Sequence, residues 1–420
     1  MADLIEVTGG KRLTGEVGVY GAKNAVLKEM VATLMAPGRH VLANVPGIVD
    51  VDLMGQVLTH IGCTIERDDH TLTIDVPDEL NPEAPLDLVR SMRASIIVLG
   101  PLLARVGRAR VAFPGGDDLG ARPIDMHMKA LERMGATFEL EHGVLVGSVP
   151  SGRLSGAEVD LRFPSVGATE NAVLAAVLAE GRSIVRNPAR EPEIVDLCDH
   201  LNAMGASIAG AGTAELVIEG VRTLSPASHR VVPDRLEAGT FAVATAITGG
   251  EVTVVDCRPE HLRMELAKLE AIGCEVDRDD GRFTVRGPDR PGPVDIATLP
   301  YPGFHTDMQS QFVALLSVAE GTSVVTENLF DNRFSYVGEL ARMGADITVD
   351  WQHATVRGVW QLSGCPVMVN DIRAGAALVI AGLVADGLTT VSEIQHIDRG
   401  YERLTERLAS LGADIARVPG

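Results

Sequence analysis

The sequence predicts an α/β protein of two domains, built from six copies of one unit of about 70 residues, with three copies in each domain. The chain of 420 residues exceeds what a single hydrophobic core usually supports. A helical pattern that ends in glycine followed by Ala or Cys recurs six times. Between these glycines helical and extended patterns alternate, which is typical of an α/β fold.

The six glycines mark the same point in every copy. They are Gly62, Gly135, Gly205, Gly273, Gly344 and Gly412, about 70 residues apart. Each follows the last apolar turn of a helical pattern and precedes an extended run. A glycine in this place is typical of a left-handed helix cap, because glycine adopts positive φ without steric cost. We therefore expect a helix to end at each of them.

Each copy reads as helix, strand, helix, strand, strand. The first helices are apolar and are expected at 25–35, 95–106, 172–179, 241–247, 312–319 and 376–385. The strands after them are expected at 40–43, 109–113, 183–185, 252–255, 323–325 and 389–391. The second helix is amphipathic, as the spacing of Leu262, Leu266 and Leu269 indicates. Low aromatic content with many Ala, Val and Leu residues favours closely packed helices inside each domain.

The two ends of the chain complete one copy. The sixth copy lacks its final strand after 415–418, whereas Leu4–Val7 is a spare strand near the start. We expect these two strands to pair, since an exposed strand edge would otherwise remain. The first domain is accordingly expected at 21–229, and the second combines 1–20 with 230–420.

Composition excludes several classes of function. A net charge of −20 disfavours a nucleic-acid surface, which needs a basic face. Five cysteines without CxxC spacing indicate neither a disulfide framework nor a zinc site. The histidines form no ligand motif and no complete dinucleotide fingerprint is present, so we expect no metal and no nicotinamide cofactor. The longest apolar run, 96–104, is too short to span a bilayer, and we expect a cytoplasmic protein.

Charged residues depart from the repeat at the starts of helices. A glycine-rich loop at 114–123 carries Asp117, Asp118 and Arg122, which suits a lid that presents both charge signs. Only the first copy opens its first helix with a lysine, Lys23, and a cation at a helix N-terminus favours phosphate or carboxylate. The fifth copy has Asp307 near the corresponding place. The cations at such positions, which would form a local anion site if the helix starts converge, are Lys23, Arg93, Arg122, Arg333, Arg373 and Arg399.

Several motifs together resemble one family over essentially the whole chain. They are Gly21-Ala22-Lys23-Asn24, Arg122-Pro123-Ile124-Asp125, Ala189-Arg190-Glu191-Pro192-Glu193, Thr306-Asp307-Met308-Gln309, Glu327-Asn328-Leu329-Phe330 and the run from His396 to Arg403. The sequence is similar to the UDP-N-acetylglucosamine 1-carboxyvinyltransferase family, the enolpyruvyl transferases that begin peptidoglycan precursor synthesis. The resemblance implies a two-domain inside-out α/β barrel, closing on a cleft, with phosphoenolpyruvate and UDP-N-acetylglucosamine as substrates.

The resemblance also implies roles for individual residues. Lys23, Arg122 and Arg399 would hold phosphoenolpyruvate, and Asp307 would orient and deprotonate the sugar 3-hydroxyl. Arg333, Asp371 and Arg373 would support the closed cleft. The sugar nucleotide would contact Asn24, Arg93, Pro123, Ile124, Asp125, Met126, Ser165, Val166, Gly167 and Leu329.

Two positions depart from many members of this family. Asp117 stands where many members have a lid cysteine, which protonates phosphoenolpyruvate and is alkylated by fosfomycin. A carboxylic acid can still donate a proton if nearby negative charge raises its pKa, but it is a poor target for an epoxide. We therefore expect activity without sensitivity to fosfomycin. Phe163 replaces a lysine found in some relatives, which removes one expected phosphate contact.

Two alternatives remain open from the sequence. The shikimate-pathway enolpyruvyl transferase shares the fold and the phosphoenolpyruvate chemistry, although the Gly-Ala-Lys-Asn opening and the Pro-Gly-Gly motif of the loop favour the UDP-sugar enzyme. A non-catalytic homologue that binds the UDP-sugar is the other, against which Lys23, Asp307 and Arg399 argue. The sequence leaves the oligomeric state open.

Overall fold

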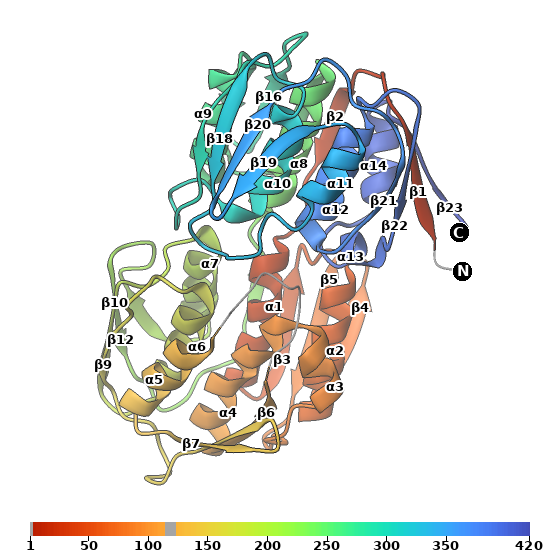
Figure 1. The fold of residues 1–420 in the computed structure, drawn as a ribbon. Coiled ribbons are helices and arrows are strands. Elements are labelled where there is room, and N and C mark those ends of the chain that lie inside the picture. Colours follow the sequence, from red (N-terminus) through yellow and green to blue (C-terminus); the bar gives the residue numbers. More distant parts are fainter. Residues whose placement is uncertain (1–2, 114–122) are drawn as a thin grey trace. The chain divides into compact units, whose positions relative to one another are not determined.

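The computed structural model describes residues 3–113 and 123–420 (Figure 1). These residues form two compact units. The first unit contains 3–20 and 233–420, and the second unit contains 21–113 and 123–232. Most of the loop expected to act as a lid, with Asp117 and Arg122, lies outside the described residues.

The described strands form six sheets with a common topology, three in each unit. In the sheet around β10 (Arg182–Arg186), the short β9 (Glu158–Asp160) is parallel to it and β12 (Glu215–Glu219) is antiparallel. β11 (Ser207–Ala209) then pairs with β12 at the edge. Four further sheets repeat this order, and in the sixth an isolated bridge between Glu83 and Arg110 stands at the place of the first strand.

The remaining strands follow the same scheme. In the first unit they are β1 (Leu4–Thr8), β2 (Thr14–Gly18), β14 (Glu251–Val255), β15 (Glu275–Asp279), β16 (Arg282–Arg286), β17 (Ile296–Ala297), β18 (Thr322–Thr326), β19 (Asp346–Asp350), β20 (His353–Arg357), β21 (Pro366–Met368), β22 (Leu388–Ser392) and β23 (Asp414–Val418). In the second they are β3 (Gly38–Ala43), β4 (Thr64–Asp68), β5 (Thr71–Val76), β6 (Arg108–Ala112), β7 (Thr137–Glu141), β8 (Val144–Ser148) and β13 (Ser228–Arg230).

The short first strands of four sheets were not expected from the sequence. β9, β13, β17 and β21 have two or three residues each, which is too few to show a period of two. Each lies before a first helix or, for β13, at the end of the second unit, where it pairs in parallel with β3. The predicted order of helix, strand, helix, strand, strand therefore lacks one leading strand.

The first helix of each copy lies inside its unit, and the sheets lie outside. The central helices are α1 (Lys23–Ala32), α4 (Leu99–Val106) with the 3₁₀ helix η2 (Arg93–Val98), α6 (Val166–Ala176), α8 (Arg235–Thr248), α10 (Gln309–Leu316) and α12 (Ile372–Gly382). Every residue of α12 is buried, as expected for a helix that is apolar on all sides. A Cβ at Gly100 would lie 2.8 Å from the carbonyl oxygen of Asn171, so glycine allows α4 and α6 to approach closely.

The second helices lead to the repeated glycines. They are α2 (Val49–Ile61), α5 (Asp125–Arg133), α7 (Pro192–Ala203), α9 (Arg263–Ala271), α11 (Val337–Arg342) and α14 (Leu404–Ser410). The shorter helices are α3 (Leu86–Ser91), α13 (Gln395–Asp398), η1 (Thr33–Met35), η3 (Pro259–Leu262) and η4 (Thr306–Met308). All six repeated glycines have positive φ, between 93° at Gly344 and 121° at Gly62, which confirms the predicted caps.

The predicted pairing of the two ends is also confirmed. β1 lies between β22 and β23, with Leu4 opposite Val418 and Thr8 opposite Asp414 (Figure 1). Within the described residues, the chain passes between the units in two segments, one between β2 and α1 and the other between β13 and α8. Among the described helices, none is both long and apolar enough to cross a membrane.

Candidate active site

Lys23 begins helix α1 in the second unit and forms a nearly buried ion pair. Its Nζ lies 2.9 Å from Oδ2 of Asp50 on α2, and the two side chains are 11% and 1% exposed. The preceding backbone is tightly placed, since a Cβ on Gly21 would lie 1.9 Å from the carbonyl oxygen of Asn44. Ala22, the N-cap residue, offers no side chain to cap the helix. A cation thus stands at a helix N-terminus, where backbone N–H groups favour an anion.

A second part of this unit is organised by a buried histidine. Asn171 Oδ1 accepts a hydrogen bond from the Gly100 amide, so its Nδ2 group donates to Nδ1 of His127 at 2.8 Å. His127 therefore carries its proton on Nε2. Burial, reinforced by the charge of Arg93, lowers the pKa of His127 to about 4, so the ring is neutral.

The same histidine joins the starts of α5 and α6. A Cβ on Gly167 would lie 2.8 Å from Cε1 of His127 and 3.1 Å from its Nε2. Ser165 caps α6, with its Oγ accepting from the Ala168 amide at 3.4 Å. The predicted stretches 123–126 and 165–167 are therefore neighbours, and the field of Arg93 acts on the histidine between them.

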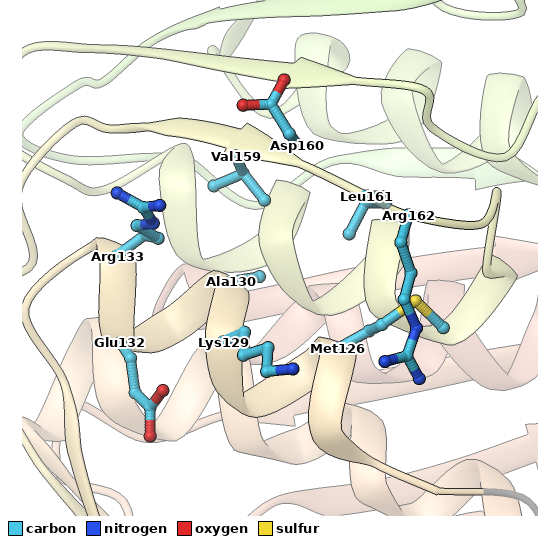
Figure 2. Close-up of a pocket in the computed structure, with 9 residues that line it drawn as sticks. All are labelled: Met126, Lys129, Ala130, Glu132, Arg133, Val159, Asp160, Leu161 and Arg162. Carbon is cyan, nitrogen blue, oxygen red and sulfur yellow. The ribbon is translucent and has the colours of Figure 1, made fainter.

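Asp125, the first residue of α5, has two charged partners. It forms ion pairs with Arg162 at 3.0 Å and with Lys129 at 3.3 Å. Figure 2 shows a pocket of about 480 Å³ in which Lys129 and Arg162 extend near Met126, while Val159 and Leu161 face α5. The lining residues are Met126, Lys129, Ala130, Glu132, Arg133, Val159, Asp160, Leu161 and Arg162. The lining combines apolar side chains with three cations and two carboxylates, and it includes the predicted site residue Met126.

Asp307 in the first unit lies between two buried arginines. Its Oδ1 is 2.7 Å from Nη2 of Arg333, and its Oδ2 is 3.5 Å from Nε of Arg373. Both arginines are 3% exposed. Burial lowers the pKa of Arg333, but the negative charge of Asp307 and its neighbours outweighs it and the net shift is upward. The guanidinium groups thus hold the carboxylate in a fixed orientation.

The arginines are themselves positioned by the start of α12. Asp371 caps this helix and accepts from the amide of Arg373 at 2.7 Å. The guanidinium of Arg373 lies 5.0 Å from the ring centroid of Tyr401, whose hydroxyl contacts Thr240 at 2.9 Å. Nη1 of Arg373 is buried without a hydrogen-bond partner among the described residues. Buried donors without a partner are rare in native structures.

Leu329 lies beside the turn that carries Asp307, and Arg399 lies near the start of α12. Glu327 accepts hydrogen bonds from Thr306 in η4 and from the amide of Leu329, both at 2.9 Å, and so fixes Leu329 beside the turn that carries Asp307. Arg399 follows α13 and is half-buried. A Cβ on the next residue, Gly400, would lie 2.4 Å from Cγ2 of Ile372, which places Arg399 near the start of α12.

The predicted site residues thus fall into two sets. The second unit holds Lys23, Asn24, Arg93, Pro123, Ile124, Asp125, Met126, Ser165, Val166 and Gly167. The first unit holds Asp307, Leu329, Arg333, Asp371, Arg373 and Arg399. Sequence reasoning missed the partners of these residues, Asp50, His127, Asn171, Glu327 and Tyr401. Only Tyr401 and Glu327 had a sequence signal, because they lie within motifs that were singled out.

Comparison with known proteins identifies the family of this chain. The family model for EPSP synthase (3-phosphoshikimate 1-carboxyvinyltransferase) matches residues 7–408. The chain is 53% identical over 421 residues to the UDP-N-acetylglucosamine 1-carboxyvinyltransferase of Anaeromyxobacter dehalogenans (strain 2CP-C), covering all of both chains. The chain belongs to the enolpyruvyl transferase family. The protein of that same name from Mycobacterium tuberculosis (strain CDC 1551 / Oshkosh) is 52% identical over 418 residues, again with full coverage of both.

Solved enolpyruvyl transferases share the fold. The enolpyruvyl transferase NikO from Streptomyces tendae superposes with a TM-score of 0.90 at 26% identity, covering 100% of this chain and 99% of that one. An EPSP synthase from Acinetobacter baumannii gives a TM-score of 0.75 at 20% identity, with all of both chains covered, and supports the fold alone. The predicted family and the predicted inside-out α/β barrel fold are therefore confirmed.

Proposed function

We propose that this enolpyruvyl transferase moves the enolpyruvyl group of phosphoenolpyruvate to the 3-hydroxyl of UDP-N-acetylglucosamine, with release of phosphate. The main support is the identity of 51–53% over nearly the whole chain with relatives that carry the name of this reaction. The reaction is the first committed step of peptidoglycan precursor synthesis, and a cytoplasmic location is part of the proposal. The two sets of charged residues fit the two anionic substrates.

Two carboxyl groups would act as the base and the acid of the addition step. Asp307 accepts the proton of the sugar 3-hydroxyl while the oxygen of that hydroxyl bonds to C2 of phosphoenolpyruvate. Asp117 donates a proton to C3. The product is a tetrahedral adduct. In the elimination step the bond between C2 and the phosphate oxygen breaks, phosphate leaves, and C3 returns its proton as the double bond re-forms. Positioned acid and base groups contribute roughly 10²–10⁴-fold each. The ion pairs from Arg333 and Arg373 support the role of Asp307, because they fix its carboxylate.

Cations would hold phosphoenolpyruvate and stabilise the departing phosphate. Lys23, Arg122 and Arg399 are the proposed ligands of its phosphate and carboxylate. The position of Lys23 at the start of α1 supports this role, and Asp50 keeps its ammonium group in place. The unpartnered Nη1 of Arg373 is a further donor for an anion on the Asp307 side.

The sugar nucleotide would bind mainly through the second unit. Asn24, Arg93, 123–126 and 165–167 are its proposed contacts there, and Leu329 is the proposed contact from the first unit. The neighbouring starts of α5 and α6 support this assignment, since both present backbone N–H groups. The Nε2–H group of His127 adds a neutral donor beside Gly167.

The 3-phosphoshikimate enolpyruvyl transferase reaction is the second candidate. One observation favours it, because the matching family model carries that name. The relatives at 51–53% identity carry the other name, whereas the EPSP synthase structures are only 20% identical. The UDP-sugar reaction is therefore the better supported. A non-catalytic binding protein would have no need for a carboxylate held between Arg333 and Arg373.

Phosphate release with each substrate omitted in turn tests the proposal. We expect release with phosphoenolpyruvate and UDP-N-acetylglucosamine together, and none when either is absent. Release with 3-phosphoshikimate in place of the sugar nucleotide would select the second candidate. Binding of the sugar nucleotide without release in any mixture would select the non-catalytic protein.

A further inference from the structure

Four titratable side chains meet inside the second unit, away from the proposed catalytic groups. They are Glu29 on α1, Asp196 and His200 on α7, and His229 on β13. Glu29 lies six residues after Lys23, about 9 Å farther along the helix. The side chains of Glu29 and His200 are fully buried, and those of Asp196 and His229 are 11% and 14% exposed.

The cluster has two hydrogen-bonded pairs. Oδ1 of Asp196 lies 2.9 Å from Nε2 of His229, and Glu29 forms a close hydrogen bond with Nδ1 of His200. The two imidazole rings stack with centroids 4.8 Å apart. One ligand atom from each of Glu29, Asp196 and His229 lies within 4.8 Å of the other two. Small side-chain movements would therefore bring three ligands to one ion.

Two buried atoms in the cluster lack partners. Oε1 of Glu29 and Nε2 of His200 have no hydrogen-bond partner among the described residues. Buried polar atoms are satisfied in the great majority of native structures, and an ion or an ordered water commonly accounts for an exception. The carboxylate of Glu29 thus has one oxygen held by His200 and one available for a ligand.

We propose that Glu29, Asp196 and His229 bind one divalent transition-metal ion of the Zn²⁺ type, with His200 orienting Glu29. Two carboxylates and one imidazole are a donor set that suits such an ion. Two carboxylate charges balance a divalent cation in a buried place, and water completes the coordination. The hydrogen bond from His200 is the outer contact that metal-binding carboxylates usually have.

The ion would link the last strand of the second unit to two of its helices. β13 is its last strand and pairs with β3, and Oδ2 of Asp196 accepts from the amide of Val232 just beyond it. Asn44 on the β3 side donates to the carbonyl of Val231 at 2.9 Å. A metal shared by α1, α7 and β13 would add a link at the point where the chain leaves this unit. Its role is therefore structural, and the proposal is independent of the enolpyruvyl reaction.

Metal binding to the full chain tests this inference. Protein stripped with a chelator is dialysed against Zn²⁺ or Mg²⁺ and its metal content is measured, and its melting temperature is recorded with and without the ion. We expect one Zn²⁺ per chain and a higher melting temperature, and no retained Mg²⁺, which prefers an all-oxygen octahedral site. Co²⁺ in place of Zn²⁺ should give visible absorption bands from the bound site.

Variants separate this site from adventitious binding. Glu29→Gln and His229→Gln should lose the ion and the Co²⁺ bands, while His200→Gln should bind about 10–100-fold more weakly. Asp199→Asn, an exposed change on the same helix, should bind as the unchanged chain does. Failure of the unchanged chain to retain Zn²⁺, or equal retention by Glu29→Gln and His229→Gln, would overturn the proposal. Circular dichroism of each variant verifies that it is folded.

Discussion

The guanidinium of Arg333 lies 2.7 Å from the carboxylate of Asp307, and both belong to the first unit. Arg373 approaches the other oxygen of the same carboxylate at 3.5 Å. Two fixed positive charges hold this carboxylate in one orientation. The side chain of Asp307 is itself only partly exposed, at 21%.

Asp307→Asn should remove the base and leave substrate binding largely intact. The amide has nearly the same size but cannot accept the hydroxyl proton, so we expect kcat to fall by about 10²–10⁴-fold. Steady-state phosphate release measures kcat, and calorimetric titration measures affinity for the sugar nucleotide. Asp331→Asn, an exposed change four residues from Glu327, is the control and should leave both values unchanged. Full activity of Asp307→Asn would rule out this residue as the base.

Variants of the ion pair between Lys23 and Asp50 can distinguish an effect on stability from an effect on activity. Lys23→Ala leaves the buried Asp50 carboxylate without its ammonium partner, which should lower the free energy of unfolding by about 3–5 kcal/mol. Lys23→Ala with Asp50→Ala should recover most of that stability, because the buried charge is removed as well. Both the single and the double variant should lack activity if Lys23 binds phosphoenolpyruvate. Denaturant unfolding and phosphate release measure the two properties, and a double variant with normal kcat/KM would contradict the assignment.

The repeat could be predicted from sequence because its signals are local. Gly62 and Gly412 mark helix ends by backbone freedom alone, and both have positive φ as expected. The pairing of β1 with β23 followed from counting one strand too many at the start and one too few at the end. β17, with two residues, was missed because so short a strand has no periodicity.

The site could be predicted only in part. Lys23 and Asp307 were singled out because their charge breaks the repeat, and the family motifs suggested the roles that we propose for both. The partners were not found. Asn171 binds His127 from 44 residues away in the sequence, and Thr240 reaches Tyr401 across 161 residues. A single sequence contains no signal that pairs such positions, since each residue alone is an ordinary polar side chain.

Glu170 should make stability depend on pH. Burial raises the pKa of Glu170 to about 7, although Lys28 at 3.6 Å opposes the shift. The folded chain then binds more protons than the unfolded chain between about pH 4.5 and pH 7, so this residue makes stability fall as pH rises through that window. The contribution lost is about 3 kcal/mol. Glu170→Gln should flatten this dependence in denaturant unfolding at several pH values, whereas exposed Glu180→Gln should not; an unchanged profile would contradict the shift.

We predict that Asp117 determines the response of this chain to fosfomycin. Thiolates open the epoxide of this drug, whereas a carboxylic acid is a weak nucleophile, so the unchanged chain should keep its activity during incubation with the drug. Asp117→Cys should be inactivated in a time-dependent way, with one drug adduct per chain by mass spectrometry. Asp118→Cys places the same thiol one residue away and should stay active, because that position is not the proposed proton donor. Asp117→Asn should lower turnover by about 10²–10⁴-fold, since the amide has no proton to donate. Rapid stoichiometric inactivation of the unchanged chain would contradict the first expectation, and full turnover by Asp117→Asn would mean that another group supplies the proton to C3.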